Sequence, residues 1–448
     1  MQRLLRPRKG VPVSGHKELT AGKPIVEGPI PSELVFPMMM HSGVPAEVCV
    51  KVGDQVRIGT QVGRAPQHIS ANIHSSVSGT VKAIEQRDSF RGPTLSVVIE
   101  NNGLDDKQWL EPLDESISAE KFFGRLRDAG ITGKGGAGFP AHVKLSPRNQ
   151  RHRYVLINGA ECEPFSTTDH RTMLEYAPEI LHTVELLRRL FNTEHNVIAI
   201  EDDKPDAIAR LQEVAGDLGY KHIRIRKVHG RYPQGDQGVL LRSVFGLEIP
   251  QGKFPNEMGI LTSNVSTVKA VHDAVFMGRP LVRRVITVTG PVIANPQNVL
   301  TRVGTPVREL VDFCGGFTGD VGKMINGGPM MGRPFSAPEI PVVKDTTTIL
   351  CFGAEARVRP EERACIRCAK CIDVCPVNLQ PILISNARRA GRLDLCKVLK
   401  AESCIYCGCC TYICPSRIPL LKDIMAGLEQ LRQSEAPRSK PQNSSIQL

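Results

Sequence analysis

Eight cysteines near the C-terminus constrain this chain more than any other feature. The first four have the spacing C-x2-C-x2-C-x3-C-P and are Cys365, Cys368, Cys371 and Cys375. The same spacing returns 39 residues later in Cys404, Cys407, Cys410 and Cys414. Such runs are typical of iron–sulfur ligation, in which three closely spaced thiolates bind one 4Fe–4S cluster. The sequence therefore predicts two clusters and a chain that transfers single electrons.

In two-cluster ferredoxins with this motif, the fourth cysteine of each run binds the other cluster. The expected ligands of one cluster are Cys365, Cys368, Cys371 and Cys414. The expected ligands of the other are Cys404, Cys407, Cys410 and Cys375. Zinc ribbons use paired C-x2-4-C ligands separated by a loop, so this spacing favours clusters over zinc, and over disulfides. Arg367 and Lys370 are expected to tune the cluster potentials.

Six further cysteines are scattered through the chain, and small buried apolar side chains are their expected role. They are Cys49, Cys162, Cys314, Cys351, Cys396 and Cys409. Cys409 is adjacent to Cys410, but the regular repeat favours Cys410 as the ligand.

The 448-residue length predicts three or four domains, and 41% hydrophobic with 23% charged residues fits soluble, well-packed domains. No apolar run approaches the 18 residues of a membrane helix, and the N-terminus lacks the apolar core of a signal peptide. We therefore expect a cytoplasmic protein, or one that reaches a membrane only through partners.

The net charge is +11, and Arg3, Arg6, Arg8 and Lys9 form a basic N-terminal arm without an acid. No nucleic-acid-binding motif accompanies this charge, so no nucleic acid is expected as a partner. Two explanations stay open for the arm. It is either a solvated segment or a contact for anionic lipid or an acidic partner.

Residues 1–115 are expected to form short β segments, since Gly, Pro and Ser interrupt the apolar residues. Segments 50–63 and 76–81 resemble the two halves of the barrel-sandwich fold of biotinyl and lipoyl domains. The position of the modified lysine in those domains is His68 here. A swinging-arm function is therefore not expected, and a structural or docking role is.

The middle of the chain alternates strand and helix patterns. Expected strands are 154–157, 196–200 and 223–228, and expected helices are 118–130, 175–192 and 205–218. This alternation predicts a largely parallel α/β sheet over residues 116–282. Residues 283–348 return to β patterns around a short helix at 307–313 and resemble a soluble-ligand-binding β-grasp domain. Residues 349–430, with helices between the cysteine runs, predict a helical ferredoxin domain, and 431–448 a disordered tail.

A glycine-rich loop matches the pattern G-x-G-x-x-G and contains Gly133, Lys134, Gly135, Gly136 and Gly138. A Rossmann fingerprint follows a strand and opens a helix. Here an expected helix precedes the loop and Pro140 follows it, so the Rossmann interpretation is rejected. The glycines still let the backbone approach a flat or anionic ligand, and Lys134 and Lys144 can pair with phosphates. The alternative is a tight structural turn.

Asn158, Glu161 and Glu163 follow the first strand of the α/β domain. Ligands of α/β sheets gather beyond the carboxyl ends of the strands. The two carboxylates suit hydrogen bonds from ribose hydroxyls or flavin N–H groups. Ordinary loop charges are the alternative.

The loop and the Asn-x-x-Glu-x-Glu-Pro segment resemble the flavin and NADH site of the 51-kDa flavoprotein subunit of respiratory complex I. With the barrel-sandwich and the cysteine runs, about residues 10–425 resemble the RnfC (RsxC) family, whose members belong to the ion-translocating Rnf (Rsx) electron transport complexes.

The resemblance implies contacts with FMN for Gly133, Lys134, Gly135, Gly136, Gly138, Lys144, Asn158, Glu161, Asn264 and Thr267. It implies stacking on the nucleotide for Phe139 and a ribose contact for Glu163. Tyr232 and Asp236 lie in a segment that resembles "YxxGEE" and would contribute to the cofactor site. Three positions depart from the complex I pattern, namely Pro147, Ala160 and Gln237.

The function implied is a membrane-bound ion-translocating ferredoxin:NAD oxidoreductase, in which NADH reduces FMN and the electrons pass through both clusters to a partner. Expected partners are membrane and iron–sulfur subunits, with ferredoxin or flavodoxin contacted indirectly. The expected place is the cytoplasmic face of the bacterial inner membrane, as a peripheral subunit. Two alternatives stay open. One is a soluble cobalamin-reductase or hydrogenase-diaphorase type enzyme, and the other is a non-catalytic electron-relay adaptor.

Overall fold

The computed structural model describes residues 9–146, 151–358 and 361–435. The chain divides into two compact units, Met1–Pro7 with Pro12–Arg359 and Arg8–Val11 with Pro360–Leu448. Some residues discussed above lie outside the described residues, namely Arg3, Arg6, Arg8, Pro147 and the tail beyond residue 435. None of the helices that the structure describes is long and apolar enough to cross a membrane.

The N-terminal domain of the larger unit consists of two small antiparallel sheets. One has the order β2-β8-β7-β4, with bounds Glu33–Pro37, Thr94–Asn101, Gly79–Arg87 and Gln55–Val56. The other has the order β3-β5-β6, with bounds Glu47–Val48, Gln61–Arg64 and Ile73–His74. Side chains of both sheets, including Phe36, Val62 and Val97, share one buried core. Because such short strands are marginal alone, this common core holds the two sheets together.

The central domain is built on four parallel strands in the order β11-β10-β9-β12. In that order their bounds are Ile223–Val228, His195–Glu201, Tyr154–Gly159 and Ile260–Asn264. The three predicted strands are confirmed. The fourth, β12, was not predicted as a strand.

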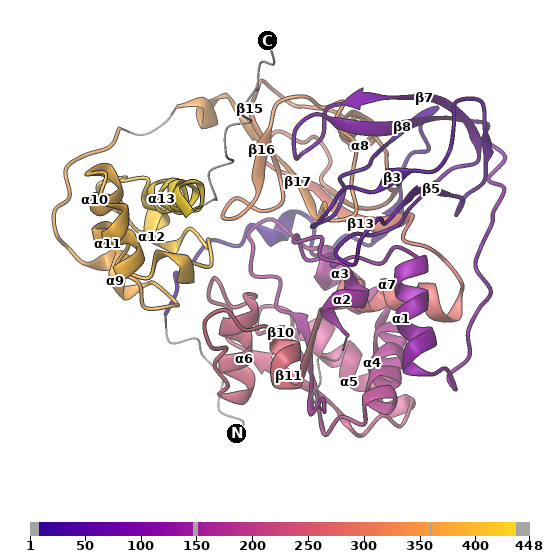
Figure 1. The fold of residues 1–448 in the computed structure, drawn as a ribbon, viewed down its shortest axis with the longest axis horizontal. Coiled ribbons are helices and arrows are strands. Elements are labelled where there is room, and N and C mark those ends of the chain that lie inside the picture. The colour runs from indigo at the N-terminus through magenta and orange to yellow at the C-terminus, as the bar shows by residue number, and fades with distance from the viewer. Residues whose placement is uncertain (1–8, 147–150, 359–360, 436–448) are drawn as a thin grey trace, which may run out of the picture. The chain divides into compact units, whose positions relative to one another are not determined.

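Helices cover both faces of this sheet (Figure 1). On one face lie α1, α3, α4, α5 and α7, with bounds Ala119–Asp128, Thr168–Glu175, Ala177–Phe191, Pro205–Asp217 and Val265–Phe276. On the other lies α6 (Gln237–Phe245). In β9, Val155 and Ile157 face the first layer and Leu156 faces the second. Burial on both faces explains why the strands read as continuous apolar runs.

Two details of the helices bear on the sequence prediction. The expected helix 175–192 is confirmed as α4, which begins at Ala177 with a proline in its first turn, whereas α3, which ends at Glu175, was not predicted. After the glycine loop only the four-residue helix α2 (Ala141–Lys144) forms, with Pro140 at its N-cap. The loop thus follows helix α1 and not a strand, which agrees with rejecting the Rossmann interpretation.

The third domain has a six-stranded sheet in the order β1-β14-β13-β17-β15-β16. In that order the bounds are Ile25–Glu27, Gln297–Arg302, Arg283–Thr289, Thr348–Gly353, Val321–Asn326 and Arg333–Phe335. The predicted helix is α8 (Val307–Phe313). Two strands come from beyond the expected limits of 283 and 348. β1 is contributed by the N-terminal segment, and β17 begins where the domain was expected to end.

Short 3-10 helices are η1 (Lys17–Leu19), η2 (Pro255–Met258), η3 (Ala354–Arg357) and η4 (Ala401–Ser403).

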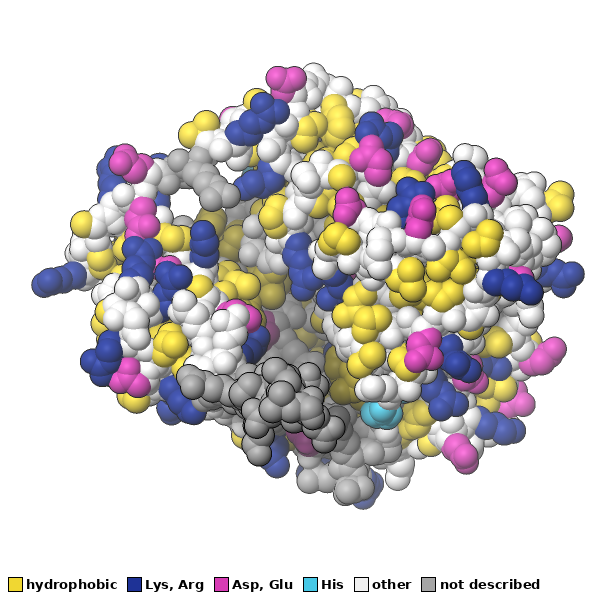
Figure 2. All heavy atoms as spheres, turned by 45° about the horizontal axis from the view of Figure 1, so that its top comes forward, with side chains coloured by type: hydrophobic (Ala, Val, Ile, Leu, Met, Phe, Trp, Pro, Cys, Tyr) yellow, Lys and Arg dark blue, Asp and Glu magenta, His cyan; other side chains and the backbone are white. Residues whose placement is uncertain are grey.

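On the face in Figure 2, acidic and basic side chains lie interspersed over much of the visible surface. The net charge of +11 is therefore not gathered into a single basic patch on that face.

Over the residues that the structure describes, the smaller unit consists of helices joined by irregular segments. Its helices are α9 (Lys370–Asp373), α10 (Pro381–Arg389), α11 (Leu393–Val398), α12 (Cys409–Tyr412) and α13 (Leu420–Glu435). Buried Asp423 on α13 accepts hydrogen bonds from Ser385 Oγ and Arg389 Nε of α10, each at 2.6 Å. α13 continues to Glu435, so the expectation that the disordered tail begins at 431 was wrong for its first residues.

Candidate functional site

Asn158 is the last residue but one of β9, Asn264 is the last residue of β12, and the two are register partners on these neighbouring parallel strands. From β9 the chain adds β10 and β11 on one side, and β12 lies on the other side of β9. The strand order therefore reverses between β9 and β12. In open α/β sheets ligands bind outside the carboxyl ends of the strands at such a switch point. The two asparagines mark this place in the fold.

Asn264 and Thr267 connect the first turn of α7 to its surroundings. Asn264 Oδ1 accepts the Ser266 N–H at 2.9 Å, which makes Asn264 the N-cap of the helix. Asn264 Nδ2 donates to Asp169 Oδ2 at 2.5 Å. Thr267 Oγ1 accepts the backbone N–H of Lys134 at 2.8 Å. This bond places the glycine loop against the N-terminus of α7, where anions are favoured.

The glycine loop closes on itself, because the Gly133 N–H donates to the Phe139 carbonyl at 2.8 Å. Gly136 and Gly138 have φ values of +98° and +62°. A Cβ on Gly138 would lie 2.8 Å from Asp345 Oδ2, whereas one on Gly136 would meet nothing within 4 Å. Residues 135–137 are exposed. The loop therefore presents open backbone beside Asn264, as a flat ligand would require.

The two lysines predicted for phosphate differ in their surroundings. Lys134 is buried, and burial together with nearby Arg284 and Lys269 holds its pKa well below the usual range. Its side chain is thus not the exposed cation that the sequence suggested. Lys144 is half-buried at the end of α2, and burial lowers its pKa to about 8. Of the two, Lys144 is the better candidate for a phosphate contact near neutral pH.

Glu161 and Asn158 form hydrogen bonds within the protein. The Glu161 carboxylate accepts the backbone N–H groups of Asp169 at 2.7 Å and His170 at 3.0 Å, at the start of α3. Asn158 Nδ2 donates to the Gly235 carbonyl at 2.8 Å, and its Oδ1 accepts the Ala160 N–H at 3.0 Å. In this conformation both side chains shape the loop after β9.

Glu163 contacts a loop of the β-grasp domain. Its carboxylate accepts the N–H groups of Met330 at 3.1 Å and Met331 at 2.9 Å. Burial raises the Glu163 pKa to about 7. A Cβ on Gly328 would lie 2.1 Å from Glu163 Oε2. Only glycine therefore permits this approach of the loop to the carboxylate.

The remaining residues that were predicted to bind a cofactor are buried, half-buried or hydrogen-bonded within the protein. Tyr232 is buried, and Phe139 is half-buried in the glycine loop. Asp236 is the N-cap of α6, accepting the Gly238 N–H at 2.9 Å and the Val239 N–H at 3.0 Å. Gln237 Oε1 accepts the Thr262 hydroxyl at 2.7 Å. The glutamine at this departure from the complex I pattern is thus bonded to β12.

Two residues of the site were missed by sequence reasoning. Asp169 receives hydrogen bonds from Asn264 Nδ2 and from Ser266 Oγ, the latter at 2.6 Å. Burial raises its pKa to about 6, and Glu161 adds to the effect. Arg284 is fully buried and donates to the backbone carbonyls of Lys134 and Lys344. Neither lies in a recognisable motif, although Asp169 stands in the first turn of a helix.

Seven of the eight predicted cluster ligands, all but Cys365, separate into two groups of interacting thiols. Burial raises the pKa of Cys371, and Cys414 and Cys368 raise it further. Burial raises the pKa of Cys410 to about 12, with additional effects of Cys407, Cys404 and Cys375. Each group pairs the close cysteines of one run with the last cysteine of the other run. This is the arrangement expected for crossed ligation.

The thiols also lie where they fit a cluster. Cys375, Cys404, Cys407 and Cys410 line one pocket of the smaller unit, together with Cys409. Backbone N–H groups donate to sulfur, from Leu379 to Cys375 at 3.2 Å and from Tyr406 to Cys404 at 3.4 Å. Among residues 9–146, 151–358 and 361–435, no three His, Cys, Asp or Glu side chains converge on a point that would hold one metal ion. In a 4Fe–4S cluster each thiolate binds a different iron, so its ligands do not need to converge.

The expectation that the other six cysteines are buried was partly wrong. Cys314, Cys351, Cys396 and Cys409 are buried, but Cys49 is exposed and Cys162 is half-buried. Cys49 lies on the loop after the two-residue edge strand β3, which covers it poorly. Cys162 belongs to the loop beyond β9, between the two glutamates.

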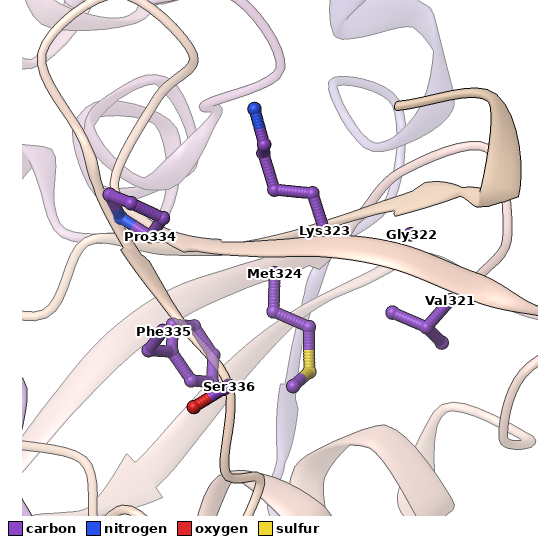
Figure 3. A pocket seen from close by; sticks show the side chains of 7 residues that line it. All are labelled: Val321, Gly322, Lys323, Met324, Pro334, Phe335 and Ser336. Atoms are coloured by element: carbon purple, nitrogen blue, oxygen red, sulfur yellow. The ribbon is translucent and has the colours of Figure 1, made fainter. Parts of the chain in front are cut away.

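His68 stands on an exposed turn of the barrel-sandwich, and its carbonyl oxygen lies 3.0 Å from His142 Nε2 of α2. A hollow of the β-grasp domain lies elsewhere, along β15 and β16, and has a volume of about 550 Å³. In Figure 3, Lys323 and Met324 point to opposite sides of β15, as neighbouring strand residues do. None of the predicted cofactor residues lines this hollow.

Four family models match successive parts of the chain. They are the RnfC barrel sandwich hybrid domain over residues 5–104, the Nuo51 FMN-binding domain over 126–273, the SLBB domain over 285–334, and the 4Fe-4S dicluster domain over 364–418.

Full-length relatives agree with these matches. The C subunit of the Na⁺-translocating ferredoxin:NAD⁺ oxidoreductase complex of Acetobacterium woodii is 38% identical over 85% of this chain and 87% of its own length. The C subunit of the proton-translocating complex of Clostridium ljungdahlii is also 38% identical, over 88% of this chain and 86% of its own length. This chain belongs to the RnfC family of ion-translocating oxidoreductase complexes. The expected barrel-sandwich, flavin, β-grasp and dicluster domains are thereby confirmed.

As a member of the RnfC family, the chain is an electron-transfer subunit of an oxidoreductase complex, with FMN and 4Fe–4S clusters as cofactors. A solved structure of an NAD⁺-reducing [NiFe]-hydrogenase in the air-oxidised state has a TM-score of 0.49 and 17% identity, over 71% of this chain and 68% of that one. A similarity at this level carries no argument about function.

Proposed function

We propose that this chain is the subunit at which NADH delivers its electrons to the complex. The observation that supports this most is the meeting of the glycine loop, Asn264 and Thr267 at the strand switch point of a flavin-binding domain. The same chain also carries two sets of cluster cysteines. It therefore combines the components that turn a two-electron donor into a source of single electrons, and flavin supplies that conversion when bound.

The residues that we assign to FMN act mainly through the backbone. Gly135 and Gly136 offer exposed peptide groups for close approach of the ring system. Lys144 and the N-terminus of α7 suit the phosphate. Thr267 and Arg284 hold the Lys134 peptide from two sides, so the loop is positioned before a ligand arrives. Asn158 and Glu161 define the end of β9 and contribute to the floor of the site.

The nucleotide would bind beside Phe139 and Glu163. A ribose contact by Glu163 requires its carboxylate to exchange the Met330 and Met331 N–H groups for ribose hydroxyls. The names of the two relatives include NAD⁺ as a substrate of their complexes, and this supports the proposal. We further propose that the chain is a peripheral subunit at the cytoplasmic face of the membrane. It would contact membrane and iron–sulfur subunits there, and ferredoxin or flavodoxin only through them.

The test is an anaerobic titration of the cofactor-loaded chain with NADH, followed by optical and EPR spectra. Flavin bleaching should precede the appearance of reduced-cluster signals. Dithionite should reduce the clusters with or without nucleotide. Clusters that dithionite reduces and NADH does not, in protein with full flavin occupancy, would refute NADH input.

One observation favours a second candidate function, an electron-relay adaptor that does not bind nucleotide. Glu163, the residue assigned to ribose, is half-buried and accepts two backbone N–H groups of the β-grasp loop. In an adaptor this contact would be permanent and purely structural. The NADH titration distinguishes the two functions, because an adaptor would hold flavin without its reduction by NADH.

A further inference from the structure

The two sets of cluster cysteines differ in their exposure to solvent. Cys365 and Cys368 are exposed, and so is every residue from 361 to 370. In the other set Cys375, Cys407 and Cys410 are buried. One of the two electron-carrying positions of the smaller unit therefore lies at its surface, and the other lies inside it.

Charge follows the same division. Segment 363–371 contains Arg363, Arg367 and Lys370 but no acid, and segment 411–418 contains Arg417 but no acid. Segments 375–380 and 404–410, which carry the buried set, contain no charged residue. Among the described residues, none of these four cations takes part in an ion pair. These four cations lie in the segments of the exposed cysteines, whereas a single lysine, Lys9, acts electrostatically on Cys375 of the buried set.

Hydrogen bonds bring the two cationic segments together. The Arg363 N–H donates to the Ser416 carbonyl at 2.9 Å, and Ser416 Oγ donates to the Ala364 carbonyl at 2.9 Å. Two large apolar side chains of these segments are exposed, Ile366 by 67% and Tyr412 by 53%. An apolar centre with a polar rim is typical of protein interfaces. The rim here is mainly basic, although Glu361 and Glu362 are exposed nearby, the latter paired with Arg389.

We infer that this surface, defined by Arg363, Ile366, Arg367, Lys370, Tyr412 and Arg417, docks the acidic surface of a one-electron carrier protein. One electron passes between the carrier and this chain at each encounter, and no bond or proton is exchanged. The basic rim would speed the encounter and orient it. The inference rests on the assignment of the cluster cysteines and does not depend on NADH as the donor.

The same charges should affect reduction potentials, since nearby charge and solvent exposure set the potentials of iron–sulfur clusters. Cations stabilise the more negative, reduced state. The exposed position should therefore have the higher potential, and electrons within the unit should collect at the docking surface.

The experiment uses the full chain with both clusters, reduced by dithionite so that NADH plays no part. Reduced-cluster EPR signals are followed by freeze-quench after mixing with [Co(EDTA)]⁻ or with hexaamminecobalt(III). The anion should react faster than the cation, and salt should slow the anion and speed the cation. The double variant Arg367→Gln, Lys370→Gln should lower the anion-to-cation rate ratio about tenfold, the lower end of steering effects. In an EPR redox titration it should lower the potential of one cluster only.

A matched control is Lys422→Gln with Arg432→Gln, which removes two cations of α13. It changes the net charge equally and should leave both the anion-to-cation rate ratio and the cluster potentials unchanged.

A protein probe completes the test. Carbodiimide should cross-link oxidised flavodoxin, used as a model acidic carrier in place of the partner subunit, to Lys370. Lys370→Arg should lose the cross-link but keep the rate ratio. Equal effects of the two double variants, or cross-links confined to other lysines, would overturn the inference.

Discussion

The Glu163 carboxylate accepts the backbone N–H of Met331 at 2.9 Å and thereby joins the loop after β9 to the β-grasp domain. The residue that the family resemblance assigns to the nucleotide thus already has a partner inside the protein. A nucleotide that uses Glu163 must compete with this partner. The contact also explains why glycine stands at position 328, where any side chain would collide with the carboxylate.

Exchanging Glu163 for glutamine separates the nucleotide role from the structural one. We expect Glu163→Gln to raise the KM for NADH about tenfold while flavin and clusters stay bound, because an amide loses one strong acceptor. Gly328→Ala would push the loop and the Glu163 carboxylate apart while keeping glutamate at position 163, and it should not raise KM. Stopped-flow flavin reduction by NADH measures the KM of both variants. If Glu163→Gln saturated with NADH at the same concentrations as the wild type, Glu163 would have only the structural role of holding the β-grasp loop.

Gly136 tests the position of the flavin. Gly136→Val should abolish FMN binding, because the new side chain would occupy the space that a Cβ at this position enters freely. The positive φ adds strain of about 1–2 kcal/mol. Gly246→Val is the control, since Gly246 also has a positive φ, +72°, and open space around its Cβ, but lies at the end of α6. The measurement is the flavin content of the purified proteins. Equal flavin content in both variants would show that the flavin does not bind at Gly136.

Much of the fold was predictable because it depends on local patterns. The strands β9, β10 and β11 are apolar runs of the length expected for a buried parallel sheet, and the cysteine spacing requires no tertiary information. β1 was not predictable, because three residues, Ile25–Glu27, gain strand structure only from pairing with β14 far along the chain.

The candidate site was predictable as a location but not as a set of contacts. The switch point followed from the strand order and the glycine loop from its sequence. The hydrogen bonds of Glu161 to the start of α3 did not, because they depend on left-handed backbone at Glu161 and Phe165. Arg284 reaches the glycine loop from the β-grasp domain, 150 residues away. Such contacts arise from packing between domains and leave no periodic signal.

Lys144 predicts a pH dependence of flavin binding. Its pKa of about 8 means that the ammonium form predominates below pH 8 and is lost above it. The FMN phosphate is a dianion over most of this range, since its second pKa is about 6. FMN affinity should therefore fall as pH rises from about 7 to about 9.5. Lys144→Ala should weaken FMN by about 1–3 kcal/mol near neutral pH and remove the dependence.

The control for this prediction is Lys144→Arg, which keeps a positive charge at every pH tested. Its FMN affinity should stay flat over the same pH range. Fluorescence titration of the flavin-free chain gives each dissociation constant. If FMN affinity fell with pH in the same way in the wild type and in Lys144→Ala, a group other than Lys144 would be responsible for the pH dependence.

Crossed ligation of the clusters is tested by removing one cysteine from each proposed set. Cys414 interacts with Cys371, and Cys375 interacts with Cys404 and Cys410, although each pair comes from different runs. Cys414→Ala should therefore disturb the cluster bound by the first run, as Cys365→Ala does, while Cys404→Ala disturbs the other. Intact protein should contain about eight iron and eight acid-labile sulfide. EPR of the dithionite-reduced variants identifies the affected signal. If Cys414→Ala and Cys404→Ala abolished the same signal while Cys365→Ala spared it, each run would bind its own cluster and the crossed assignment would be wrong.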